Sequence, residues 1–248
     1  MGEHTIREVL KRRSDDTQRV IRRRRDRALN KANVRRRSYG PLLIIVVIVL
    51  AIIAAIVYSG WWAAQISERF SAERAASALS SSGPNLNLQA TTQFLPNTLL
   101  AVTDPNFYSN SDLTISPVTE RLVSMYFPQA SPLAVKIMVL TLQYRYSRTD
   151  ILEAFINDVP VGINNNQSIR GFAAASQAYF KKPFAYLQPQ DIALLVALAA
   201  DQKNIDPRND REQALNLRNA VLEKDVQQTV LSRTQVDLLK KTPLDIAP

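Results

Sequence analysis

The chain has 248 residues, 46% of them hydrophobic, which is enough for one sizeable core and accessory segments. Its formal net charge of +9 resides in residues 1–40, which hold 14 of the 31 basic and 5 of the 22 acidic residues. The rest of the chain has equal numbers of both signs, so we expect no nucleic acid among its partners. With no cysteine and a single histidine, His4, the chain excludes disulfides and, outside the basic tail, cysteine- or histidine-ligated zinc and histidine catalysis.

An apolar segment at residues 41–62 follows the basic tail of residues 1–40. No side chain from Leu42 to Tyr58 is charged or strongly polar, and Trp61 and Trp62 suit a membrane interface. A secretory signal peptide would have a shorter apolar region of about 7–15 residues and a shorter basic region. The pattern therefore predicts a single transmembrane helix, with the basic tail in the cytoplasm and the remaining chain outside. The tail arginines also suit anionic lipid or nucleic acid, although topology alone accounts for them.

The residues after this segment are predicted to be mostly helical. Residues 63–93 form a continuing helix to about residue 79, a break at residues 80–85 and a loop to about residue 94. Further helices are expected at residues 133–144, 149–157, 171–180, 190–200 and 211–228. Residues 190–200 are nearly all apolar but too few to span a bilayer, which predicts a buried central helix. Residues 94–248 are therefore expected to form one mostly α domain.

Six motifs in this domain occur in a recognisable order. They are Phe94–Tyr108, Arg145–Asn157 with Val161 and Gly162, Ile169–Phe172, Ala178–Phe180, Gln190–Ala200 with Asp206 and Pro207, and Arg218–Leu222. Together they resemble the family 51 glycosyltransferase domain, the peptidoglycan polymerase module of class A penicillin-binding proteins and monofunctional transglycosylases. The resemblance extends to about Ile246, although Leu217 replaces one of two paired arginines in the last motif. It implies a lysozyme-like α-helical domain, outside the cytoplasmic membrane of a bacterium.

The resemblance also implies a reaction. This family joins lipid-linked disaccharides: a glutamate deprotonates the acceptor hydroxyl, which displaces the lipid pyrophosphate of the donor. Such chemistry needs a general base, together with cations or a divalent metal at the pyrophosphate. Thr103 stands where the family has its catalytic glutamate, and Val135 stands where the family has a second one. Loss of general base catalysis typically costs about 10²–10⁴-fold in rate.

Other motif positions have changed as well. Asn110 replaces the usual histidine of the first motif, and Glu120 and Arg121 replace the paired glutamines of the second. Only a short link separates Tyr108 from Ser116, which indicates that the mobile segment lining the family's substrate groove is deleted. Residues that would hold a core persist, whereas those that would perform chemistry are altered, so the pattern predicts a retained fold with a dismantled site.

The remaining candidates have both a functional and a structural interpretation. As fallback bases we name Asp104 and Glu120, although Asp104 also suits a helix cap and Glu120 a solvated face beside Arg121. The substrate-binding candidates are Arg121, Arg145, Arg148, Asn157 and Arg170, whose arginines suit either a pyrophosphate or a plain surface. Tyr144, Tyr146 and Phe155 are assigned to the core. We predict no metal site and no cofactor, with Mg²⁺ required only by an active enzyme.

Three functions follow from these observations. The leading hypothesis is a membrane-anchored, catalytically inactive glycosyltransferase-like protein that acts as a scaffold, regulator or lipid-ligand binder in the bacterial envelope. Its partners would be the cytoplasmic membrane, lipid-linked peptidoglycan precursor and other cell-wall synthesis proteins. The alternatives are an active polymerase that uses Asp104 or Glu120 as its base, and an anchor that acts through the arginine-rich tail. Since the outer region has no Ser-x-x-Lys motif, no penicillin-binding transpeptidase domain is expected.

Overall fold

The computed structural model describes residues 17–27 and 29, residues 41–54, single positions between 57 and 71, and residues 85–164, 167–201 and 205–247. The chain divides into two compact units, Met1–Trp62 and Ala63–Pro248. In the first unit, residues 17–27 and 41–54 are helical. No helix among the described residues is both long and apolar enough to cross a membrane. Parts of the segments 41–62 and 63–93 lie outside the described residues, so the transmembrane and juxtamembrane helices stay predictions.

The second unit is mostly helical, as predicted. Its elements are α2 (Phe94–Thr103), α3 (Pro117–Tyr126), α4 (Pro132–Arg145), α5 (Arg148–Asp158), β1 (Pro160–Asn164), β2 (Gln167–Arg170), α6 (Phe172–Phe180), the short 3₁₀ helix η1 (Phe184–Tyr186), α7 (Pro189–Ala200), α8 (Arg211–Gln227) and α9 (Arg233–Lys241). The five helices expected between residues 133 and 228 are all present, with bounds that differ by one or two residues. Helix α9 was not expected individually.

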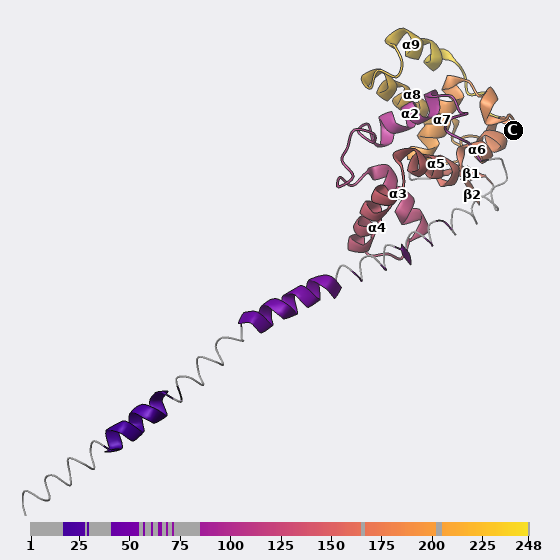
Figure 1. The fold of residues 1–248 in the computed structure, drawn as a ribbon. Helices are drawn as coiled ribbons and strands as arrows, with labels where there is room; N and C mark the ends of the chain where they lie inside the picture. The colour runs from indigo at the N-terminus through magenta and orange to yellow at the C-terminus, as the bar shows by residue number, and fades with distance from the viewer. Residues whose placement is uncertain are drawn as a thin grey trace, which may run out of the picture. The chain divides into compact units, whose positions relative to one another are not determined.

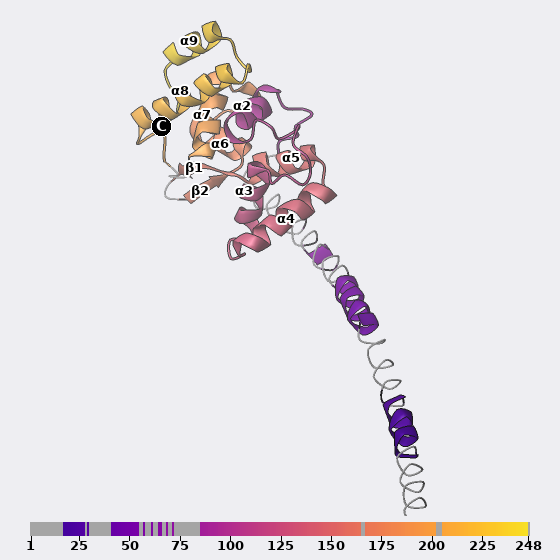
Figure 2. The same cartoon turned by 90° about the vertical axis from the view of Figure 1, so that its left-hand side faces the viewer.

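Helix α7 is the centre of this unit. Its residues from Asp191 to Ala199 are all buried, which confirms the predicted central helix. Helices α2 and α8 pack against it, while α3, α4 and α5 contact one another. In both views α4 lies at one end of the unit and α9 at the other, with α7 between them (Figures 1 and 2). The two groups of helices meet at the C-terminal end of α2, where the candidate site lies.

Serine caps begin four of the helices. In α3, α4, α5 and α9 the N-cap serine accepts a hydrogen bond from a backbone amide of the first turn, and these serines are Ser116, Ser131, Ser147 and Ser232. A serine hydroxyl there satisfies an amide that has no partner within the helix. Proline follows the cap in α3 and α4, where its missing N–H costs no hydrogen bond. These local signals fix where the helices around the site start.

Two features differ from the sequence analysis. Strands β1 and β2 form an antiparallel hairpin, with Ile163 opposite Ser168, which the helical pattern did not predict. Residues 165 and 166, between the two strands, lie outside the described residues. The core assignment of Tyr144 is wrong, because this side chain is 86% exposed. Helix α4 has apolar residues on both faces, so its sequence did not show which face is buried. Phe155 is fully buried, as predicted.

A buried carboxylate makes the stability of this unit depend on pH. Asp225 on α8 has no exposed surface, and its Oδ2 accepts a hydrogen bond from the Thr98 hydroxyl at 3.0 Å. Burial raises the pKa of Asp225 to about 6, from 3.8 in an exposed carboxyl group. Because the folded protein holds this proton more tightly, the contribution of Asp225 to stability is greatest below about pH 4, falls between about pH 4 and pH 6, and then stays level.

Asp225→Asn should remove that fall. We expect the variant to gain on the order of 2 kcal/mol in free energy of unfolding at pH 7 relative to wild type, since its neutral side chain has no charge to desolvate. Urea unfolding of the full-length protein in mild detergent at a series of pH values measures this. The control Asp237→Asn changes an exposed carboxylate on α9 and should retain the wild-type profile. Parallel profiles for wild type and Asp225→Asn would refute the assignment.

Candidate functional site

An open groove of about 530 Å³ lies between the two groups of helices. Its lining includes Thr103 at the end of α2, the α3 residues Glu120, Arg121 and Ser124, Phe155 on α5 and Ala200 at the end of α7. Three of the predicted site positions, Thr103, Glu120 and Arg121, are thus brought together. Ser124 was missed, although it follows Glu120 and Arg121 by one helical turn and therefore shares their face of α3.

Thr103 lines this groove and carries a hydroxyl group. Its Oγ1 donates to the backbone carbonyl of Leu99, one turn earlier in α2, at 2.7 Å. Such a back-bond occupies the hydroxyl proton and leaves the oxygen lone pairs for a ligand. In this arrangement Thr103 can accept a hydrogen bond, but a threonine hydroxyl cannot serve as a general base near neutral pH.

Arg121 supplies the groove with a cation. Its Cζ lies 6.0 Å from the centroid of the Phe155 ring, and its guanidinium makes no hydrogen bond or ion pair with any residue that the structure describes. Partial burial lowers the pKa of Arg121, yet an arginine remains charged at neutral pH. A half-buried guanidinium stacked on a ring retains its donors for an anionic ligand.

Glu120 supplies the only carboxylate among the described residues that line this groove. It is partly exposed, and its side chain makes no hydrogen bond or ion pair within the described part of the chain. Its backbone carbonyl accepts a hydrogen bond from the Ser124 hydroxyl at 2.8 Å. A single carboxylate is a poor set of protein ligands for Mg²⁺, and the described residues contain no cluster of three or more acidic or histidine side chains.

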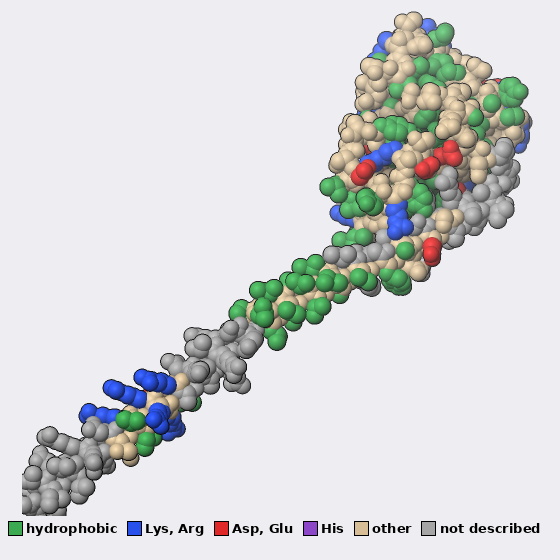
Figure 3. Space-filling model, in the orientation of Figure 1, with side chains coloured by type: hydrophobic (Ala, Val, Ile, Leu, Met, Phe, Trp, Pro, Cys, Tyr) green, Lys and Arg blue, Asp and Glu red, His purple; other side chains and the backbone are tan. Residues whose placement is uncertain are grey.

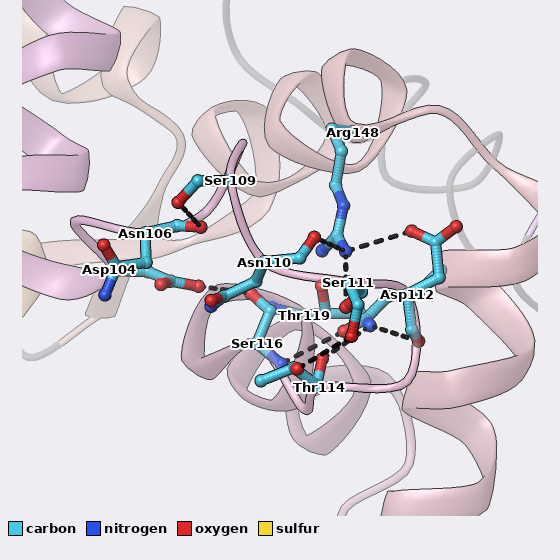
Figure 4. A network of polar contacts seen from close by, with 11 residues as sticks. Asp104, Asn106, Ser109, Asn110, Ser111, Asp112, Thr114, Ser116, Thr119 and Arg148 are labelled. Atoms are coloured by element: carbon cyan, nitrogen blue, oxygen red, sulfur yellow. Dashed lines mark hydrogen bonds and ion pairs between the residues drawn. The ribbon is translucent and has the colours of Figure 1, made fainter.

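Asp104 follows Thr103 but does not line the groove. Its side chain is buried, and its Oδ2 accepts a hydrogen bond from the Ser116 hydroxyl at 2.6 Å (Figure 4). Ser116 is at the same time the N-cap of α3, and its backbone N–H donates to Oε1 of Gln143 at 3.1 Å. Asp104 therefore connects the end of α2 to the start of α3, which is a structural use of this carboxylate.

Arg148 holds the short loop between Asp104 and Ser116. From the first turn of α5 its side chain points into the loop, where it donates to Oδ1 of Asp112 at 3.1 Å and to two backbone carbonyls (Figure 4). Its Cζ also lies 5.5 Å from the centroid of the Phe107 ring. The guanidinium predicted to bind substrate is thus engaged inside the domain, where it stabilises this short loop.

The other predicted positions lie apart from the groove lining. Asn157 pairs with the backbone of Leu86, accepting from its N–H at 2.8 Å and donating to its carbonyl at 2.9 Å, so it holds the segment that enters α2. Val135 is buried on α4. Arg145 and Arg170 are exposed, and their side chains contact no described residue through a hydrogen bond or ion pair.

Parts of the chain are similar in sequence to known proteins. Residues 116–226 match the family model described as Transglycosylase. The chain is 37% identical over 136 residues to penicillin-binding protein 1B of Buchnera aphidicola subsp. Baizongia pistaciae. The aligned segment covers 53% of this chain and 18% of that protein. The chain is 29% identical over 179 residues to penicillin-binding protein 1B of Escherichia coli K12, which covers 62% of this chain and 21% of that protein.

A solved structure is also similar. The crystal structure of penicillin-binding protein 1A from Haemophilus influenzae matches with a TM-score of 0.46 and 19% identity, over 67% of this chain and 18% of that one. The chain therefore spans about a fifth of the length of each of these relatives.

Proposed function

We propose that the chain is a membrane-anchored, catalytically inactive member of glycosyltransferase family 51, a proposal supported by the match of residues 116–226 to the Transglycosylase model and by the similarity to penicillin-binding protein 1B. The observation that carries this proposal is the groove lined by Thr103, whose hydroxyl donates to its own helix. By sequence resemblance, Thr103 stands where the family has its base. Residues 41–62 would anchor the chain in the bacterial cytoplasmic membrane, with the basic tail in the cytoplasm and the domain outside.

Three side chains account for the proposed loss of general base catalysis. The Thr103 proton is engaged by its own helix, and the neighbouring carboxylate of Asp104 is buried and occupied by Ser116. Val135, at the second glutamate position, offers only methyl groups. Without a base at the acceptor hydroxyl, the reaction loses about 10²–10⁴-fold in rate.

The groove would still bind the lipid-linked disaccharide, although it no longer catalyses the polymerisation. The Arg121 guanidinium has free donors for a pyrophosphate, and Phe155 gives it an aromatic support. Thr103 can accept a hydrogen bond from a sugar hydroxyl. The protein would then hold the lipid-linked disaccharide precursor at the membrane without joining it, and act as a scaffold or regulator for the enzymes that use this precursor.

Replacing Arg121 tests the binding step. Arg121→Gln should weaken binding of a fluorescent lipid-linked disaccharide pyrophosphate by about 10–100-fold, because a hydrogen bond to a charged group contributes about 1.5–3 kcal/mol. Titration of the full-length protein in detergent micelles measures this. The matched control is Arg145→Gln, which removes an arginine that is exposed and outside the groove lining. The binding proposal is wrong if wild type shows no saturable binding, or if both variants lose affinity equally.

The second candidate function is an active polymerase with Glu120 as its base. It is favoured by one observation: Glu120 lines the same groove as Thr103, with no side-chain partner in the described residues. In that case Glu120→Gln would abolish polymerisation of lipid-linked disaccharide, whereas Thr103→Ala would leave it nearly unchanged. If wild type forms no polymer, this candidate is excluded.

A further inference from the structure

The first unit contains a short helix that is dominated by arginine. Residues 17–27 are helical and all exposed, and they carry six arginines, at positions 19, 22, 23, 24, 25 and 27, against the single acidic residue Asp26. Lys and Arg side chains project along this helix in the space-filling view (Figure 3). None of the six guanidinium groups makes a hydrogen bond or ion pair with a described residue. The helix thus concentrates positive charge that the described chain does not neutralise.

This helix is poorly suited to pack against a protein core. At about 100° per residue, six arginines in nine consecutive positions point to every side of the helix. The apolar side chains Val20 and Ile21 stay about half exposed, at 52% and 56%. A helix of this length is marginal in water, and like charges one turn apart destabilise it further. An anionic surface that contacts several arginines at once would relieve this repulsion.

We propose that helix 17–27 binds the phosphate headgroups of an anionic lipid surface, that of the membrane in which the chain is anchored. The inference rests on the proposed anchoring. Residues 28–40 lie between the helix and the apolar segment, and an extended chain of that length reaches roughly 50 Å at most, so the arginines stay close to the bilayer. Arginine binds phosphate oxygens bidentately, and each basic residue near an anionic membrane contributes about fivefold in affinity.

RNA or DNA presents the same phosphate chemistry, but the anchor favours lipid. A tethered helix encounters headgroups at a high local concentration, whereas a nucleic acid must be captured from solution. The contact is electrostatic, since guanidinium groups on all sides leave no apolar face to insert. It should therefore weaken with salt and should not discriminate strongly between arginine and lysine.

A single label reports this contact. The chain has no cysteine, so Gln18→Cys in the full-length protein allows one fluorophore beside the arginines. The protein is placed in nanodiscs of phosphatidylcholine alone, or with about one-third phosphatidylglycerol, and quenching by the neutral molecule acrylamide is measured. We expect the anionic lipid to shield the label about twofold or more, and salt of about 1 M to reverse the shielding.

Two sets of substitutions separate the effect of positive charge from the effect of arginine itself on the shielding. R22Q/R23Q/R24Q/R25Q should lose the shielding, whereas R22K/R23K/R24K/R25K should retain it. Equal quenching in neutral and anionic discs, or shielding that appears only when RNA is added, would overturn the proposal. Flotation with neutral vesicles tests the anchor separately. If the chain does not float with neutral vesicles, the proposed anchoring is wrong. In that case the lipid contact is tested by anionic vesicles, with which the chain should float only when the arginines are present.

Discussion

Replacing Arg218 by methionine is expected to lower the free energy of unfolding by about 3 kcal/mol. Arg218 on α8 is completely buried, and its guanidinium donates to the carbonyls of Lys240 at 3.1 Å and Thr242 at 2.8 Å, at the end of α9. It also donates to the Asn219 side chain. These carbonyls have no partner within the helix, and the variant would leave them partly buried without a protein donor.

Urea unfolding of the full-length protein in detergent measures this loss. Lys224→Met is a matched control, because Lys224 is an exposed basic residue on the same helix, and it should change stability by less than about 0.5 kcal/mol. Arg218→Lys should recover only part of the loss, since an ammonium group cannot span the two carbonyls as the planar guanidinium does. A loss as small as that of Lys224→Met would show that Arg218 does not join α8 to α9.

Gly171→Ala should have the largest effect, a loss on the order of 4 kcal/mol or failure to fold. Gly171 has φ +79° and ψ 152°, a conformation that is essentially restricted to glycine. An added Cβ would lie 2.2 Å from the backbone oxygen of Asn157, at the end of α5. The backbone has little freedom to move away, because the Gly171 N–H donates to the carbonyl of Val159 at 2.9 Å.

The comparison with Gly162→Ala makes this prediction specific. Gly162 also has a positive φ, of +71°, but the atom that its Cβ would meet first is the Tyr179 hydroxyl at 2.5 Å. A side chain can shift more readily than a backbone, so we expect Gly162→Ala to be the milder change. Expression and thermal unfolding of both full-length variants give the ranking. Equal stability of Gly171→Ala and wild type would mean that α5 and α6 do not approach as described.

Most of the helices could be predicted because their signals are local. A serine before a proline predicts a helix start, and the apolar run of α7 predicts its burial whatever surrounds it. The hairpin of β1 and β2 was not predicted because its strands have only five and four residues and their pairing is irregular between Pro160 and Ile163. The exposure of Tyr144 was not predicted because α4 carries apolar residues all round, which leaves the buried face undetermined.

The sequence predicted several positions that line the groove, but not the residues with which the other candidate side chains form hydrogen bonds. The motif order located Thr103, Glu120 and Arg121, which the fold gathers in one groove. Whether Arg148 reaches a ligand or the neighbouring loop depends on contacts with residues 36 to 38 positions away, which no local pattern encodes. The same holds for Asp104, whose partner Ser116 lies 12 positions along the chain and belongs to the next helix.

The central claim is that the domain proposed to belong to glycosyltransferase family 51 binds lipid-linked disaccharide without joining it. Its most direct test is glycan polymerisation from labelled lipid-linked disaccharide by the full-length protein, with and without Mg²⁺, beside an active family member. We predict that the active enzyme forms polymer and that this protein forms none under either condition. Polymer that is made by the wild-type protein and disappears in Glu120→Gln would contradict the claim and would identify Glu120 as the base.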